Sequence, residues 1–251
     1  MTTQTLTRLR ELKLSGMAAA LEHQQAQVGT FEALPFIERL SLLLEQEHLL
    51  RDNRKQERLI RQAHFKLRAT TQEIDYAHPR NIQRAQIARL AQGDWLERAQ
   101  NLLITGPCGS GKTYLACAIG HAACMREFSV RYFRLSRLML ELTQAKADAT
   151  YVKLLKQLAK VQLLILDDWG LEPLQPAHRH NLMEILDDRH TETSTLVISQ
   201  LPTDQWYVSI GDNTLADAIL DRLMHNAHTL KLKGESMRKV LAQLTKDEHL
   251  Q

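Results

Sequence analysis

The chain has 251 residues, of which 44% are hydrophobic and 24% are charged. This composition excludes a mini-protein and a globally disordered chain, because it supplies enough apolar surface for a core and enough charge for solubility. No stretch approaches the roughly 18 apolar residues that span a bilayer, and the first residues lack the basic-then-apolar layout of a signal peptide. We therefore expect a cytoplasmic protein with no membrane partner.

The net charge of +3 originates in the N-terminal part of the chain. Residues 1–70 hold 11 Lys and Arg against 8 Asp and Glu, whereas the remaining 181 residues hold 21 of each. Residues 51–68 alone carry seven basic and two acidic side chains. This local excess indicates an anionic partner. The three cysteines lack the spacing of a disulfide framework or a metal site, so we expect them to be small core residues.

Apolar residues three and four apart predict a small helical domain over residues 1–70. We place one helix over about residues 4–27 and a second over about 34–65, with Gly29 between them. Pro35 suits the first turn of the second helix, where its missing N–H has no partner in any case. Residues 71–100 form a polar segment, which we expect to be a linker.

Residues 101–251 change to short apolar runs separated by helical stretches, which is typical of an α/β domain. Such runs predict buried strands of a five-stranded, mostly parallel sheet. The five runs are Asn101–Thr105, Ser129–Leu135, Gln162–Asp167, Ser194–Ser199 and His228–Leu232. Ligands of such sheets gather at the carboxyl ends of the strands.

A complete GxxxxGK[ST] motif follows the first of these strands and precedes an apolar-periodic helix. Its glycines let backbone N–H groups turn toward a polyphosphate, and the helix directs its positive end to the same place. The lysine supplies a charge to the β- and γ-phosphates of ATP, and the threonine hydroxyl is suited to Mg²⁺. The alternative is a glycine-rich turn without a ligand. The motif consists of Gly106, Pro107, Cys108, Gly109, Ser110, Gly111, Lys112 and Thr113.

The third of the apolar runs contains Leu163–Leu166 and leads directly into the carboxylates of Asp167 and Asp168. We expect Asp167 to hold Mg²⁺, directly or through water, and Asp168 to orient and deprotonate the attacking water. Taken alone, the pair could be a solvated strand end or a helix cap. Together with the phosphate-binding motif, it predicts ATP hydrolysis.

Four further residues have polar or cationic side chains that could act on the phosphates. Ser199 and Gln200 end the fourth strand, where one of them could position the water, although an ordinary strand exit explains them equally well. Arg222 and Arg238 are either surface cations or groups that stabilise the charge that develops during phosphoryl transfer.

A basic stripe is predicted on the second N-terminal helix, because its arginines recur at intervals of three and four. It comprises Arg51, Arg54, Arg58 and Arg61, with Lys55 beside it. A second basic run, which includes Arg134 and Arg137, ends the second strand of the α/β domain. These residues either form solvated faces or contact phosphates of duplex DNA without reading its sequence.

These motifs, in this order, resemble the AAA+ ATPases of the initiator and loader group, and most closely the IstB-like transposition helpers. The phrases that carry the resemblance extend over most of the chain. They are Leu14–Met17, Gly106–Thr113, Leu166–Gly170, Ser199–Pro202 and Gly234–Lys239.

The resemblance implies an ATP-dependent homo-oligomer on duplex DNA that prepares target DNA and stimulates a partner transposase. It also implies that Gln200, with Ser199 as second choice, is sensor 1, Arg222 an arginine finger acting in trans, and Arg238 sensor 2. Two features depart from the common AAA+ pattern. Asp168 stands where many members have glutamate, and the short stretch after Arg238 implies a truncated helical lid.

Two other readings remain open. A DnaC-like replicative helicase loader would share the ATPase core and use the N-terminal domain to grip a helicase. An architectural DNA-binding protein would keep the nucleotide for structure alone. Binding to a hexameric helicase would favour the first, and nucleotide binding without turnover would favour the second.

Overall fold

The computed structural model describes residues 2–234 and 236–237. The chain divides into two compact units, Met1–Arg58 (unit 1) and Leu59–Gln251 (unit 2). In the part of the chain that the structure describes, no helix combines the length and the apolar character needed to cross a membrane.

Unit 1 is helical, as expected, but the helix expected over residues 4–27 is two helices. The model contains α1 (Thr2–Glu11), α2 (Ser15–Ala26) and a one-turn α3 (Val28–Phe31). The break falls at Lys13, whose φ of 59° lies in the left-handed region that ends helices. The helix expected over 34–65 is α4 (Phe36–Ala63), which Pro35 immediately precedes and which continues into unit 2.

The start of α2 is held by a side chain of α4. The Glu47 carboxylate accepts hydrogen bonds from the backbone N–H groups of Gly16, at 2.7 Å, and Met17, at 3.2 Å. These N–H groups belong to the helix end that carries a partial positive charge, so a carboxylate stabilises it. Gly16 is required by the close approach of the two helices, because a Cβ there would lie 2.7 Å from the Glu47 Cα.

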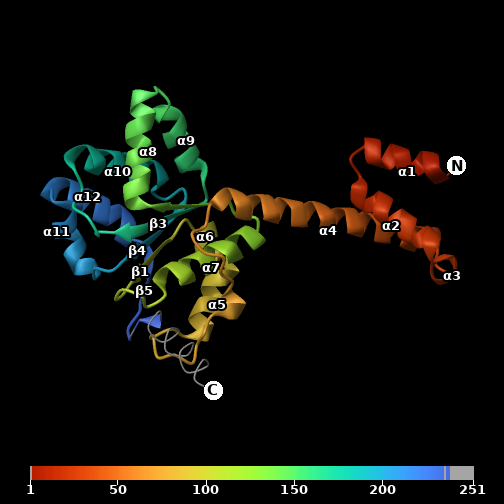
Figure 1. Cartoon of the computed structure of the whole chain (residues 1–251), viewed down its shortest axis with the longest axis horizontal. Coiled ribbons are helices and arrows are strands. Elements are labelled where there is room, and N and C mark those ends of the chain that lie inside the picture. The colour runs from red at the N-terminus through yellow and green to blue at the C-terminus, as the bar shows by residue number, and fades with distance from the viewer. Residues whose placement is uncertain (1, 235, 238–251) are drawn as a thin grey trace, which may run out of the picture. The chain divides into compact units, whose positions relative to one another are not determined.

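Unit 2 is built on a five-stranded sheet in which all neighbouring strands are parallel. The strand order is β2-β3-β4-β1-β5 (Figure 1). The expected strands are confirmed, with shifts of no more than two residues at their ends. They are β1 (Asn101–Thr105), β2 (Val130–Arg134), β3 (Leu163–Trp169), β4 (Ser194–Ser199) and β5 (Ala227–Lys231).

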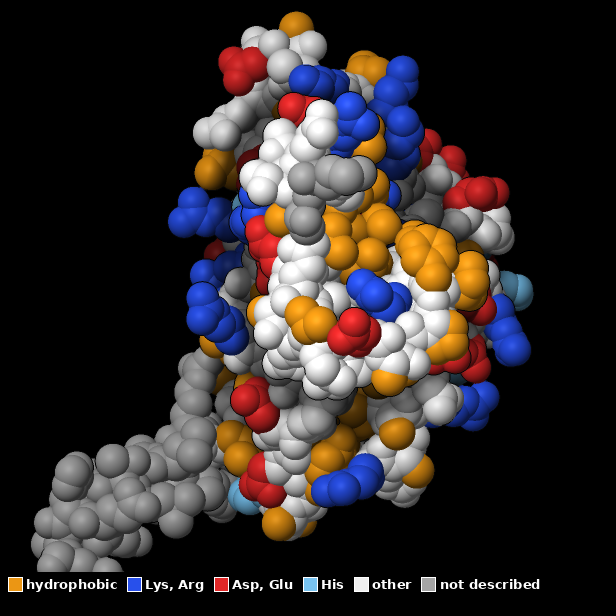
Figure 2. Space-filling view, turned by 90° about the vertical axis from the view of Figure 1, so that its right-hand side faces the viewer, with side chains coloured by type: hydrophobic (Ala, Val, Ile, Leu, Met, Phe, Trp, Pro, Cys, Tyr) orange, Lys and Arg blue, Asp and Glu red, His pale blue; other side chains and the backbone are white. Residues whose placement is uncertain are grey.

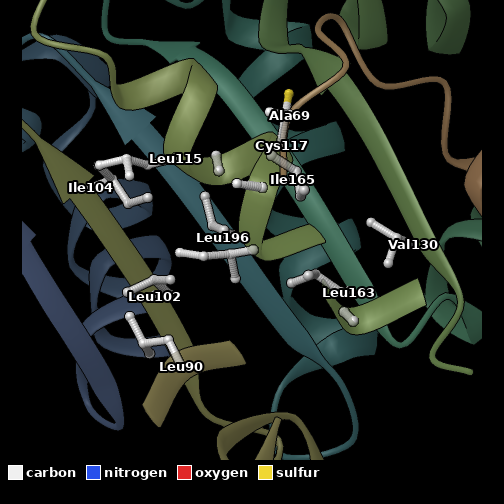
Figure 3. Close-up of a cluster of buried hydrophobic side chains, with 14 of the residues drawn as sticks. Ala69, Leu90, Leu102, Ile104, Leu115, Cys117, Val130, Leu163, Ile165 and Leu196 are labelled. Atoms are coloured by element: carbon white, nitrogen blue, oxygen red, sulfur yellow. The ribbon is translucent and has the colours of Figure 1, made fainter. Parts of the chain in front are cut away.

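Helices cover both faces of this sheet, so alternate residues of each central strand enter different cores. Leu102 and Ile104 point into one core with α5 and α7, whereas Leu103 points into the other with α8, α9, α10 and α12 (Figure 1). Figure 3 shows the first core, in which Leu115 of α7 lies against the strands. The unit-2 helices are α5 (Arg84–Gln92), α6 (Asp94–Glu97), α7 (Lys112–Met125), α8 (Leu135–Ala147), α9 (Tyr151–Lys160), α10 (Pro176–Arg189), α11 (Trp206–Ile210) and α12 (Asn213–Met224), with 3₁₀ turns at Thr71–Glu73 and Thr203–Gln205.

Residues 71–100 are not a linker. They contain α5 and α6, and Ile87, Leu90 and Trp95 from this segment are buried in the first core. Burial of these side chains makes the segment part of the sheet domain, and the boundary between the units falls inside α4 instead. The lid expected after residue 238 lies outside the described residues.

Candidate functional site

The glycine-rich motif forms the turn between β1 and α7, at the carboxyl edge of the sheet. Lys112, the first residue of α7, is only 7% exposed. Its Nζ donates hydrogen bonds to the carbonyl oxygens of Gly106, at 2.7 Å, and Pro107, at 2.8 Å. Burial lowers the pKa of this ammonium group, and Cys108 and the nearby Asp167 and Asp168 carboxylates act in the opposite direction. Lys112 is thus a cation poised in a low-dielectric site, where a phosphate oxygen would be a strong partner.

Two glycines of the motif are required by close neighbours. Gly111 has a φ of 92°, and a Cβ there would lie 2.6 Å from a guanidinium nitrogen of Arg80. A Cβ on Gly106 would lie 2.7 Å from the carbonyl oxygen of Leu232. The chain on both sides therefore packs against the turn so closely that only hydrogen atoms fit at these positions.

Asp167 is the hub of a buried hydrogen-bond cluster and is 2% exposed. Its Oδ2 accepts from Thr113 Oγ1 at 2.9 Å and from the Tyr132 hydroxyl at 2.6 Å. Lys66 Nζ lies 4.0 Å from the same oxygen. The pKa of Tyr132 is raised, first by burial and then by its hydrogen bond to this carboxylate. Asp167 is therefore held as an oriented acceptor beside the threonine of the phosphate-binding turn.

The chemistry of these groups fits Mg²⁺. The Thr113 hydroxyl and the Asp167 carboxylate offer two oxygen donors side by side, the type of ligand that this ion prefers. In the part of the chain that the structure describes, no cluster of three or more His, Cys, Asp or Glu forms a metal cage.

Asp168 is paired with a cation that was expected to bind DNA. Arg134, the last residue of β2, donates from Nε to Asp168 Oδ2 at 2.7 Å. The Asp168 side chain is 20% exposed, and its residue has a φ of 61°, in the left-handed region. Parallel pairing of β2 with β3 places Arg134 opposite Asp167, which accounts for the contact.

Ser199 and Gln200 differ in their surroundings. The Ser199 hydroxyl is buried, donates to the carbonyl oxygen of Trp169 at 2.8 Å and accepts from the Leu201 N–H at 3.0 Å. Gln200 is exposed at the carboxyl edge of the sheet. The serine hydroxyl is therefore engaged in fixing the loop, whereas the glutamine side chain faces solvent.

Arg222 lies far from the phosphate-binding turn of its own chain. Its guanidinium pairs with Asp187 of α10 at 2.7 Å, and its carbonyl oxygen accepts from the side chain of Asn101, the first residue of β1. The turn follows the last residue of that strand, about 13 Å away at the usual strand rise. Arg238 lies outside the described residues.

The basic stripe lies on α4, and its members differ in their contacts. Arg51 donates to Glu47 at 2.7 Å, and Arg54 donates to the Ser15 hydroxyl at 3.0 Å. The remaining stripe residues, Lys55, Arg58 and Arg61, are exposed, as is Arg137 at the start of α8.

Three side chains at this site were not predicted from the sequence: Lys66, Arg80 and Tyr132. Arg80 is 4% exposed and contacts the carbonyl oxygens of Asp75 and Ser110. Arg80 Nε, Ser110 Oγ and His78 Nε2 are buried, and within the described residues they have no hydrogen-bond partner. Buried polar atoms without partners are costly, and Ser110 lies in the turn that Arg80 contacts, so a polar ligand there would supply the missing partners of these two residues. No local motif marks these residues, because each reaches the site from a distant part of the chain.

The parallel sheet with its phosphate-binding turn, buried lysine and paired aspartates gives unit 2 a P-loop fold of the AAA+ type. This fold is similar to that of solved structures at low sequence identity, which shows the fold alone. They include the DnaC helicase loader (TM-score 0.56, 21% identity, 66% of this chain and 97% of that chain) and AMPPCP-bound DnaA from Aquifex aeolicus (TM-score 0.56, 17% identity, 73% and 56%).

Within that class, the chain belongs to the IstB-like ATP binding protein family, whose model matches residues 7–244. It is also similar to the insertion sequence ATP-binding protein y4pL of Sinorhizobium fredii, with 47% identity over 94% of this chain and 96% of that protein. The family resemblance expected from the sequence motifs is thus confirmed.

Proposed function

We propose that the protein hydrolyses ATP while assembled as a homo-oligomer on duplex DNA, and that it assists the partner transposase of an insertion sequence. The observation that carries hydrolysis is the arrangement of Lys112, Thr113, Asp167 and Asp168 around one edge of the sheet. The insertion-sequence relatives favour transposition over helicase loading as the context.

In the proposed reaction, Lys112 binds the β- and γ-phosphates of ATP. Thr113 and Asp167 hold Mg²⁺, which supplies neutralising charge to the phosphates. Asp168 accepts the proton of a water that attacks the γ-phosphorus, and the bond between that phosphorus and the β,γ-bridging oxygen breaks. The products are ADP, phosphate and one proton. Exposed Gln200 orients this water, since the Ser199 hydroxyl already has partners.

We propose that Arg222 completes the site of a neighbouring copy. Its place near the amino end of β1 supports action in trans, because it lies at the opposite end of the strand from its own phosphate-binding turn. Its ion pair with Asp187 would have to open in the assembly, and at 59% exposure the aspartate can rehydrate readily. Arg238 keeps the sensor 2 role as a proposal from the family pattern.

Unit 1 supplies further contacts in this proposal. Unit 1 has five hydrophobic side chains among its described residues that are more than half exposed: Leu12, Val28, Phe36, Ile37 and Leu44. Figure 2 shows hydrophobic side chains on the molecular surface beside Lys and Arg. Exposed apolar side chains next to cations suit contacts with a neighbouring copy or with the transposase, beside phosphate contacts from the stripe.

The DNA contacts are tested by the salt dependence of binding. Each phosphate neutralised contributes about −0.9 to the slope of log K against log salt, so reversing Arg54 and Arg58 to Glu should weaken binding to all duplexes and flatten the slope by roughly two units. Fluorescence anisotropy on unrelated duplexes at saturating ATP measures both quantities. Reversal of Lys153 and Lys156, exposed on α9, changes net charge equally and serves as the control. Parental affinity and slope in R54E/R58E would assign the stripe to protein contacts, as a helicase loader requires.

A further inference from the structure

A buried arginine packs against the phosphate-binding turn without an acidic partner. Arg80 is 4% exposed, and among the described residues it forms no ion pair with a carboxylate. Its guanidinium donates instead to the backbone carbonyl oxygens of Ser110, at 3.4 Å, and of Asp75. Burial lowers the pKa of this guanidinium, and the charge of Asp75 is the largest effect in the opposite direction. A buried cation without a paired counter-charge destabilises a fold, which indicates that this charge does more than fill the core.

The backbone at Arg80 is fixed to the segment that follows β5. The Arg80 carbonyl oxygen accepts a hydrogen bond from the Lys233 N–H at 3.1 Å. The side-chain amide of the next residue, Asn81, donates to the Lys231 carbonyl oxygen at 2.8 Å. The arginine side chain therefore starts from a defined position, and the fold directs its guanidinium toward the turn between β1 and α7.

The contact with Ser110 orients one peptide group of the turn. No described peptide bond is cis, and in a trans peptide the C=O and the N–H point in opposite directions. Because the Ser110 carbonyl oxygen faces Arg80, the N–H of Gly111 points away from Arg80. A donor at the carbonyl oxygen also polarises the peptide and makes its N–H a stronger donor. Only glycine permits this approach, since a Cβ at position 111 would lie 2.6 Å from the guanidinium.

We propose that Arg80 is a positioning residue of the nucleotide site, which holds the Gly111 N–H toward the phosphates of ATP. Arg80 acts on the phosphates through the Ser110–Gly111 peptide, and the negative charge of the phosphates balances the buried guanidinium. This inference rests on one part of the proposed function, namely ATP binding at this turn. It requires neither DNA binding nor assembly.

The test measures the binding of a fluorescent ATP analogue to the full-length protein and its displacement by inorganic triphosphate. Arg80→Gln should weaken the binding of both ligands by the same factor, about tenfold, because the lost interaction acts on the phosphates. Arg80→Lys should recover part of this affinity, because lysine keeps the charge but lacks the fork of donors. In turnover assays, Arg80→Gln should raise the KM for ATP and leave kcat within about twofold of the wild type, the pattern of a lost uniform binding contribution.

Arg84→Gln is the matched control. Arg84 is an exposed arginine of the same segment that lies over the Tyr76 ring, and among the described residues no hydrogen bond joins it to the turn. This variant removes the same charge and should keep wild-type affinity for both ligands.

Thermal unfolding separates positioning from a purely structural role. Without nucleotide, Arg80→Gln should have a Tm no lower than that of the wild type, because the variant no longer buries an unpaired cation. The rise in Tm on addition of the ATP analogue should be smaller than in the wild type, since a ligand stabilises a protein according to its affinity.

Three results would overturn the positioning role and leave the proposed function intact. The first is wild-type affinity for both ligands in Arg80→Gln. The second is a lower Tm of nucleotide-free Arg80→Gln with no recovery of affinity in Arg80→Lys, which would assign Arg80 to the stability of the turn. The third is weaker binding of the ATP analogue alone, which would place the effect of Arg80 away from the phosphates. A wild type that binds neither ligand would overturn the proposed function together with this inference.

Discussion

Replacing Tyr132 by Phe tests the buried aspartate cluster, since it removes one oxygen and keeps the ring in the core. The Tyr132 hydroxyl donates at 2.6 Å to the Asp167 oxygen that also accepts from Thr113. Asp167 is 2% exposed, so water does not readily replace the lost donor. A hydrogen bond to a charged group contributes about 1.5–3 kcal/mol, and loss of an outer partner of a metal ligand costs about 10- to 100-fold in metal affinity or activity.

We therefore expect Tyr132→Phe to raise the Mg²⁺ concentration for half-maximal ATP turnover by about 10- to 100-fold. Binding of a fluorescent ATP analogue without Mg²⁺ should change little, because Lys112 and the phosphate-binding turn are untouched. Titration of turnover with Mg²⁺ at saturating ATP measures the effect. Tyr207→Phe, which removes a hydroxyl that donates to the Asn213 carbonyl oxygen at 3.3 Å, is the control. Wild-type Mg²⁺ dependence in a folded Tyr132→Phe protein would refute the assignment of Asp167 as the magnesium residue.

Lys112→Ala should weaken ATP binding by roughly 10- to 100-fold in equilibrium titrations, because the phosphates lose their cation; wild-type affinity would disprove the site. Asp168→Asn should bind ATP normally and turn it over about 100-fold more slowly, and unchanged single-turnover rates would move the base elsewhere. Arg222→Ala should lower turnover of the oligomer by roughly 10³-fold, and mixing it with Lys112→Ala should recover activity; co-assembly without recovery would exclude action in trans. Glu47→Gln should destabilise unit 1 by about 1–3 kcal/mol in urea unfolding. Burial raises the pKa of Glu47, but hydrogen bonds to its carboxylate, of which that from Arg51 is the largest contribution, lower this pKa overall. The ionised carboxylate therefore stabilises unit 1 above the ordinary pKa of 4.5, and this stabilisation is lost as the pH falls through the lowered pKa. Equal stability of the variant and the parent at neutral pH would contradict this role of Glu47.

Local features of the site follow directly from the sequence. The phosphate-binding turn is a contiguous motif whose backbone geometry depends on its own glycines, with Gly111 in the left-handed region. The strands were recognisable because both faces of a parallel sheet are buried, so each strand is a nearly unbroken apolar run such as Leu163–Leu166. Asp167 and Asp168 were recognisable because carboxylates rarely follow such a run directly.

The linker and the first helix show the limits of local patterns. Residues 71–100 are mostly polar and their helices are short, so Leu90 and Trp95 could not be recognised as core residues without the sheet they cover. The break between α1 and α2 has no glycine to mark it, because Lys13 adopts the positive φ there. In that case the packing of α1 and α2, and the carboxylate of Glu47 at the start of α2, decide where the helix breaks.

The sequence by itself determined the class of fold, the phosphate-binding turn and the acidic pair, since each depends on neighbours within a few residues. Only the tertiary structure decided which side chains surround them. Tyr132 and Arg134 meet the aspartates because β2 lies beside β3, and that strand order is not encoded in any local pattern. Lys66 and Arg80 arrive from segments before the sheet. The pairing of distant strands depends on the burial of whole faces of the sheet, so the side chains around the aspartates become neighbours only when the chain folds.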